Sequence, residues 1–139
     1  MCLEVLVQIA DGAPGRIGGK RLAELSGLVV TSSRLDEKPA LHLSVSGGCS
    51  CAFLAKRARH RNNTWDLEPE HVPKLLAAIR ALNSEAQKYR LVACWLNGDV
   101  ERTEQRTTGA KLLQLVGSNQ LGENVVYRTW HELRDTGFQ

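Results

Sequence analysis

The sequence predicts an α+β protein, with a single mixed β-sheet of about five strands and helices packed on it. Segments with strand periodicity alternate with segments of helical periodicity along the whole chain. Its 139 residues, 42% hydrophobic and 24% charged, match one ordinary globular domain. No internal repeat or long linker divides the chain, so residues 1–139 are expected to form one domain.

The first part of the chain predicts three strands and one short helix. The strands are short apolar or alternating segments, at residues 3–9, 28–33 and 41–45. A glycine-rich loop at 10–19 follows the first strand, and a helix at 20–25 ends at Gly27. Residues 34–39 are polar and are expected to connect the second and third strands.

The rest of the chain predicts three helices and two strands. The helices are expected at residues 50–60, 72–82 and 104–116, and the strands at 89–96 and 124–133. Residues 89–96 are apolar on both faces, which is typical of a strand in the middle of a covered sheet. Residues 65–67 predict an anchored turn, and Pro73 favours the start of the long helix. The β-α-β-β-α-β runs in this order suggest a ferredoxin-like core with additions.

The net charge of +3 comes from one basic segment, because four cations lie within residues 56–61. Arg57, Arg59 and Arg61 are therefore candidates for contact with an anion or with nucleic acid phosphates. A nucleic-acid interface usually shows a wider basic field and exposed aromatic residues, and only 5% of this chain is aromatic. A solvated helix end whose cations complement the helix dipole is the favoured interpretation.

The loop at 10–19 lacks both common phosphate-binding motifs. Pro14 stands where a Walker loop needs its first glycine, and Arg21 follows Lys20 where a serine or threonine is needed. The dinucleotide pattern of glycines is absent as well. Arg16, Lys20 and Arg21 could hold an anion without either motif, but an ordinary loop is the favoured interpretation.

The segment SVSGGCSC at residues 44–51 carries the most suggestive chemistry. If the third strand simply continues, Cys49 and Cys51 face the core as small buried thiols. If Gly47 and Gly48 redirect the chain onto a helix that begins near Ser50, the helix N-terminus would stabilise a reactive thiolate. Gly47 and Gly48 would then allow a ligand to approach the backbone closely.

A reactive cysteine also needs a base. His42 lies about 20 Å from Cys49 if the intervening chain is extended, so it is expected to be too far. His42 is instead expected on a solvated face of its strand. Whether His71 or His131 lies near the thiols cannot be judged from the sequence.

We predict neither a metal site nor a cofactor. A structural zinc site usually contains two cysteine pairs, and Cys49 and Cys51 have no second pair. Cys94 could supply a third ligand from a neighbouring strand, which keeps a metal-bound alternative open.

We expect a cytoplasmic protein without a membrane span. No run of about 18 uncharged apolar residues is present. The first strand contains Glu4 and lacks the pattern of a signal peptide. The cysteines are therefore expected as reduced thiols.

The leading functional hypothesis is a module that binds a protein or a small ligand. Asp99 follows the central strand, where ligand sites often occur in α/β sheets, and joins Gly47 and Gly48 as a candidate ligand-binding residue. The alternative is a thiol-dependent enzyme or redox protein that uses Cys49 or Cys51. The sequence assigns no enzymatic activity, and a homodimer is compatible with it.

Overall fold

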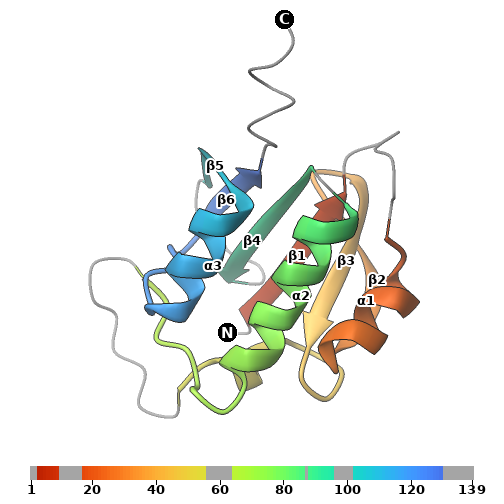
Figure 1. The fold of residues 1–139 in the computed structure, drawn as a ribbon, viewed down its shortest axis with the longest axis horizontal. Coiled ribbons are helices and arrows are strands. Elements are labelled where there is room, and N and C mark those ends of the chain that lie inside the picture. The colour runs from red at the N-terminus through yellow and green to blue at the C-terminus, as the bar shows by residue number, and fades with distance from the viewer. Residues whose placement is uncertain (1–2, 10–16, 56–63, 87, 96–101, 130–139) are drawn as a thin grey trace, which may run out of the picture.

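The computed structural model describes residues 3–9, 17–55, 64–86, 88–95 and 102–129. These residues form one six-stranded mixed sheet with three α-helices packed on it, which confirms the predicted α+β class (Figure 1). The strands are β1 (Leu3–Ile9), β2 (Val29–Leu35), β3 (Lys38–Ser44), β4 (Tyr89–Trp95), β5 (Thr103–Thr107) and β6 (Val125–Thr129). The helices are α1 (Gly19–Ser26), α2 (Val72–Glu85) and α3 (Gly109–Gly117), and η1 (Cys51–Phe53) is a single 3-10 turn.

The strand order is β2-β3-β1-β4-β6-β5, and the neighbours are antiparallel except β5 and β6, which are parallel. β4 lies between β1 and β6, as predicted for a strand that is apolar on both faces. Leu91 and Ala93 on one face and Val92 and Cys94 on the other are all buried. The β-α-β-β-α-β succession from β1 to β4 is the basis for expecting a ferredoxin-like core, and that finer assignment stays a prediction.

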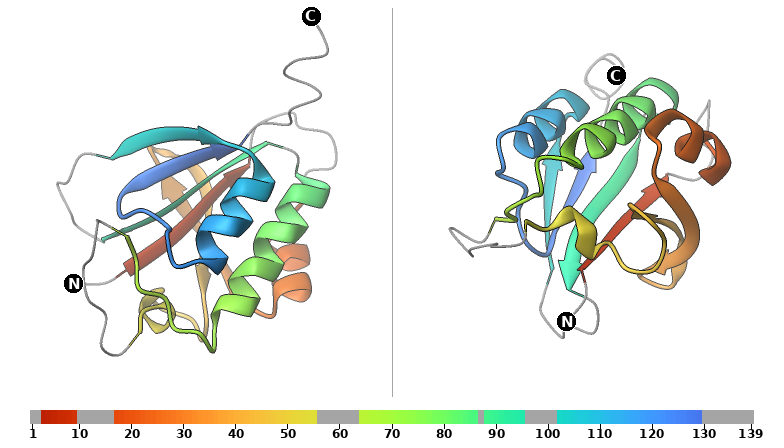
Figure 2. Two further views of the ribbon diagram at one scale, coloured as in Figure 1. Left: turned by 60° about the vertical axis from the view of Figure 1, so that its left-hand side comes forward. Right: turned by 90° about the horizontal axis from the view of Figure 1, so that it is seen from below.

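The main core lies between the sheet and the helices, and α2 lies between α1 and α3 (Figure 2). Val5 and Val7 of β1 contribute to this core, as do Leu75 and Ile79 of α2. Full burial of such a side chain stabilises a fold by about 1.5–3 kcal/mol. The turn at residues 65–67 is anchored as predicted, because the buried indole of Trp65 donates a hydrogen bond to the carbonyl of Ala93 (3.0 Å).

A second buried cluster lies on the opposite face of the sheet. Its members are Leu6, Leu35, Ala40, Val92, Cys94 and Val126. The sheet curls over this cluster. The evidence is an ion pair between its two edges: Oδ1 of Asp36, next to β2, lies 3.8 Å from Nη1 of Arg102, next to β5. β2 and β5 are the two edges of the sheet and would lie about 24 Å apart if it were flat. The face without helices is therefore concave.

The predicted polar connection at residues 34–39 is wrong, because most of it belongs to a hairpin. Arg34 and Leu35 extend β2 and pair with Pro39 and Lys38 of β3. Only Asp36 and Glu37 form the turn, with φ of 53° and 65°. Two consecutive residues with positive φ match the twist of a two-residue hairpin loop. Asp36 and Glu37 did not predict this turn, because glycine and asparagine are the usual residues at these two positions.

The predicted helix at 104–116 begins later than expected. Thr103–Thr107 forms β5, which accounts for the sixth strand, and α3 starts after Thr108. The Thr108 hydroxyl caps α3 by accepting a hydrogen bond from the Lys111 N–H (3.1 Å). Pairing with β6 outweighs the helix propensity of Glu104, Gln105 and Arg106.

No helix in the part of the chain described above is long and apolar enough to cross a bilayer.

Candidate ligand-binding site

The sequence directed attention to the loop after β3, and this loop does not begin a helix. Gly47 and Gly48 have φ of 92° and 72°, so they turn the chain where other residues would be strained. The helix predicted at residues 50–60 is wrong for its described part. The described residues form only the 3-10 turn η1 in place of a helix. Leu54, which follows η1, is extended and forms a β-bridge with Leu67.

Ser50, between the two cysteines, ties this loop to the sheet. Its hydroxyl accepts a hydrogen bond from the Val5 N–H (3.0 Å) and donates one to the Leu43 carbonyl. Val5 and Leu43 are paired residues of β1 and β3, so the hydroxyl bridges these two strands. The Ser50 N–H also bonds to the Leu3 carbonyl (2.9 Å). The loop thus continues the pairing along β1 after β3 has turned away.

His42 is close to this serine, contrary to the expectation from an extended chain. Its Nε2 lies 3.3 Å from the Ser50 hydroxyl oxygen, because Gly47 and Gly48 fold the segment back. The expected solvated face is also wrong, since His42 is buried. The Ser50 hydroxyl already donates to the Leu43 carbonyl, so His42 Nε2 must donate to the serine oxygen. The pair is therefore arranged as a structural contact and not as a base that activates a nucleophile.

Cys49 and Cys51 are half-buried, and Cys51 packs against the main core. The Cys51 sulfur accepts a hydrogen bond from the Leu3 N–H (3.3 Å). η1 is only three residues long, so the α-helix that the reactive-thiol hypothesis required does not start here. No disulfide involves Cys49, Cys51 or Cys94. The catalytic role proposed for Cys49 or Cys51 stays a prediction without this support.

The best candidate for a binding site is a recess of about 730 Å³ around Ile9. It lies at the end of β1 opposite to Leu3 and the cysteine loop. β3 and β4 both start at this end, and β6 finishes there. The lining is Val7, Gln8, Ile9, Ile17, Gly18, Gly19, Lys38, Pro39, Ala40, Leu41, Lys88, Tyr89, Arg90, Glu104, Arg128 and Thr129. Its volume is in the range of sites that hold small organic molecules.

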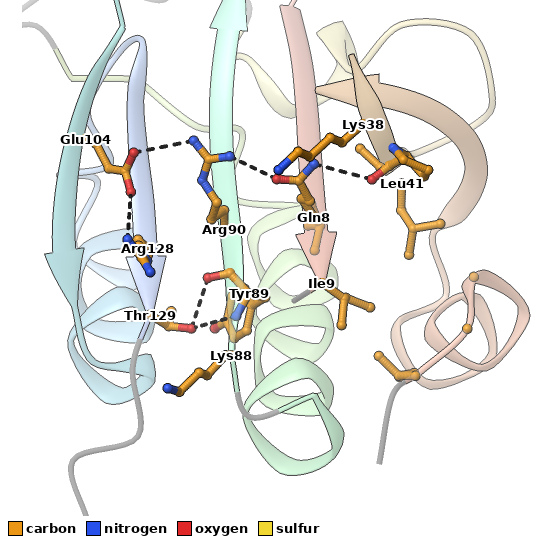
Figure 3. Close-up of a pocket in the computed structure, with 16 residues that line it drawn as sticks. Gln8, Ile9, Lys38, Leu41, Lys88, Tyr89, Arg90, Glu104, Arg128 and Thr129 are labelled. Atoms are coloured by element: carbon orange, nitrogen blue, oxygen red, sulfur yellow. Dashed lines mark hydrogen bonds and ion pairs between the residues drawn. The ribbon is translucent and has the colours of Figure 1, made fainter. Parts of the chain in front are cut away.

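Arg90 is the central polar residue of this recess. Figure 3 shows its guanidinium between Gln8 and Glu104, in a row of polar side chains across β1, β4 and β5. It donates to the Gln8 side-chain oxygen (2.9 Å) and lies 3.4 Å from carboxylate oxygens of both Asp36 and Glu104. Its Nε is buried and has no hydrogen-bond partner among the described residues. Arg90 therefore holds several elements together and retains one unused donor.

The described lining is predominantly cationic. The lining contains one carboxylate, that of Glu104, and four cations, Lys38, Lys88, Arg90 and Arg128. Glu104 is shared between Arg90 (3.4 Å) and Arg128 (3.8 Å), and Asp36 also lies 3.4 Å from Arg90, so these two carboxylates offset part of this charge. Arg128 and Lys38 are exposed, whereas three quarters of the Arg90 side chain is buried. Coulombic attraction to an anion is stronger at such a partly buried cation than in bulk water.

Part of the lining is apolar. Ile9 and Leu41 give it hydrocarbon surface, and Tyr89 is buried beside them (Figure 3). The Tyr89 hydroxyl donates to the Asn83 side chain (2.6 Å), and burial raises the pKa of this phenol above its usual value. The Thr129 hydroxyl is engaged with the backbone N–H and carbonyl of Tyr89, each at 3.1 Å. The recess thus combines a fixed apolar surface with a cationic row.

The predicted site residues do not meet in this recess. Gly47, Gly48, Cys49 and Cys51 lie near the Leu3 end of β1, and they line no part of it. Arg57, Arg59, Arg61 and Asp99 lie outside the described residues, as do Arg16 and His131, and their roles stay predictions. In the described part of the chain, no three His, Cys, Asp or Glu side chains are grouped as a metal site.

Sequence reasoning missed the polar residues of the recess. Arg90 stands in an otherwise apolar strand, and Arg128 occupies a similar place in β6. A charge within a buried strand is a signal that could have drawn attention to Arg90. Lys38 and Glu104 carried no such signal, because they were assigned to a connection and to a helix.

Comparisons of the chain with protein-family models, with curated proteins and with solved structures found no match.

Proposed function

We propose that this protein is a binding module whose ligand is a small organic anion, held in the recess around Ile9. The observation that carries the proposal is that the lining of a recess of about 730 Å³ contains four cationic side chains and one carboxylate. A carboxylate or phosphate group suits this row because guanidinium groups form charge-assisted hydrogen bonds with planar or tetrahedral oxyanions.

Arg90 is expected to contribute most of the binding energy. Three quarters of its side chain is buried, and a partly buried cation attracts an anion more strongly than a fully solvated one. Gln8 and Glu104 fix the orientation of the guanidinium before the ligand arrives. Less ordering is then needed on binding, which favours affinity.

The apolar surface beside the cations supports a ligand with a hydrocarbon or aromatic body. Ile9, Leu41 and Tyr89 lie on the same recess as Lys38 and Arg90 (Figure 3). Inorganic phosphate would contact the cations alone, whereas an aromatic carboxylate would contact both surfaces. We further propose a cytoplasmic setting, which fits the absence of disulfides at Cys49, Cys51 and Cys94.

A titration followed by two-dimensional NMR tests this proposal. Inorganic phosphate, citrate and 1-naphthoate are the probes, and the amide signals of Gln8, Ile9 and Arg90 report on the recess. We expect 1-naphthoate to bind most tightly and the Arg90→Gln variant to bind it about tenfold more weakly. Because Arg90 also links several strands, Lys38→Gln provides a second variant at an exposed side chain with no described partner.

Arg80→Gln is the matched control, because Arg80 is exposed on α2 and lies outside the recess. It removes the same charge and should leave the affinity unchanged. Equal weakening by Arg80→Gln and Lys38→Gln would mean that the net charge of the protein, and not the recess, attracts the probe. If none of the three probes shifts the recess signals at millimolar concentration, the proposal is wrong.

A further inference from the structure

The β2 edge of the sheet has the features of a surface that pairs with another strand. Among the described residues, β3 is the one strand that pairs with β2. The outer edge of β2 is seven residues long and contains no proline. Long uninterrupted edge strands of this kind are templates for pairing with a further strand.

The hairpin register shows which backbone groups of β2 point outward. Leu35 and Lys38 flank a two-residue turn and therefore exchange hydrogen bonds with each other. Hydrogen-bonded pairs alternate with non-bonded pairs along an antiparallel ladder. Val30, Ser32 and Arg34 consequently direct their N–H and carbonyl groups away from β3, and none of these N–H groups has a bond outside the sheet in the described structure.

The other edge of the sheet, β5, is different. β5 is only five residues long, and it carries Glu104 and Arg106 directly after Arg102. Charges and short length are the means by which edge strands avoid pairing. Residues 29–33 of β2, in contrast, are Val-Val-Thr-Ser-Ser and carry no charge. The sheet is thus protected at one edge and unprotected at the other.

Apolar side chains accompany the unprotected edge. Leu25 (42% exposed) and Val29 (37% exposed) are the two exposed large hydrophobic residues in the described structure. Val29 starts β2, and Leu25 belongs to α1, which packs against β2. Both exposed apolar residues therefore belong to β2 or to the helix that packs against it.

We propose that two copies of this chain associate through β2, which pairs antiparallel with β2 of the second copy about a two-fold axis at Ser32. The outward groups of this strand are self-complementary in that register. Ser32 exchanges hydrogen bonds with Ser32 of the second copy, and Val30 exchanges them with Arg34. No like charges face each other, since Arg34 lies opposite Val30. The interface is small, so a micromolar dissociation constant is expected.

Sedimentation equilibrium over a range of protein concentrations tests this proposal. The wild-type chain should show a reversible monomer–dimer equilibrium. Ser32→Lys places two like charges at the two-fold axis and should raise the dissociation constant at least about tenfold. Gln105→Lys, which adds the same charge to the exposed β5 edge, should leave the dissociation constant unchanged.

A cross-linking experiment fixes the register. In Ser32→Cys, oxidation should join two copies through a disulfide between the two residues at position 32, identified by mass spectrometry. Gln105→Cys should give no corresponding product. A wild-type chain that is monomeric at every concentration, or a dimer that Ser32→Lys leaves unchanged, would overturn the proposal. Because the recess around Ile9 plays no part in this pairing, loss of the dimer should leave 1-naphthoate binding intact.

Discussion

The two ends of β1 differ in how their polar groups are used. At the Leu3 end, the loop with Cys49 and Cys51 closes over the strand, and Ser50 is fully buried with several partners. At the Ile9 end, four cationic side chains and one carboxylate surround a recess. Ser50 therefore stabilises the fold at one end of β1, whereas ordinary strand residues line a recess at the other end.

The comparison shows that reactivity of a residue type is a poor guide to its role when the neighbours are unknown. A thiol or a histidine acts chemically only where a substrate can reach it and a partner orients it. Ser50 and His42 satisfy each other in the interior, so neither is available. Arginine is a common residue type on protein surfaces, yet Arg90 is partly buried and lines a recess.

The largest effect on stability is expected from Ser50→Ala at the closed end. This change leaves the Val5 N–H and the Leu43 carbonyl without the hydroxyl that bridges them. Loss of such buried partners should lower the free energy of unfolding by about 1–3 kcal/mol, measured by urea denaturation. Ser46→Ala, at an exposed serine of the same loop, is the control and should have little effect.

Binding of 1-naphthoate to folded Ser50→Ala should equal that of the wild type, because the recess lies at the other end of β1. A large loss of affinity in this variant would show that the two ends are coupled, and the contrast drawn between them would not hold.

A smaller effect is expected from Gly48→Ala. Gly48 has φ of 72°, and an added methyl group would meet no atom within 4 Å, so the cost comes from the backbone alone. A left-handed conformation costs about 1–2 kcal/mol for a residue other than glycine. Gly18→Ala at the recess end is the matched control, since Gly18 has φ of −89° and equally open space. Similar losses of stability in both variants would contradict this account of the turn.

The smallest effect is expected in the labelling rates of the cysteines near the Leu3 end of β1. Cys94 is buried, and burial raises the pKa of its thiol, so it should react with iodoacetamide only after denaturation. Cys49 and Cys51 are half-buried, so we expect each to be labelled more slowly in the folded protein than after denaturation. Mass spectrometry of labelled peptides measures all three rates. Labelling of Cys49 or Cys51 that is faster in the folded protein than after denaturation would favour the thiol-dependent alternative.

Local sequence patterns predicted an element correctly where its structure depends mainly on its own residues. The alternation of residues 3–9 predicted β1, and the apolar stripe of residues 72–82 predicted α2. The double-sided apolar pattern of residues 89–96 placed β4 in the middle of the sheet. The errors occurred where a partner outweighs local preference, as in β5, which pairs with β6, and in the hairpin that joins β2 to β3.

The sequence by itself therefore determined the α+β class, the central strand and the apolar face of the long helix, because periodicity records which side of an element is buried. Tertiary structure decided where the candidate binding site lies. Lys38, Arg90 and Arg128 are far apart in the chain, and only the register of β3, β4 and β6 brings them to one recess. Tertiary structure also decided the role of Ser50 as a bridge between strands, because the turn at Gly47 and Gly48 brings its hydroxyl back to β1. Contacts between distant residues depend on strand order and register, and no local pattern specifies either one.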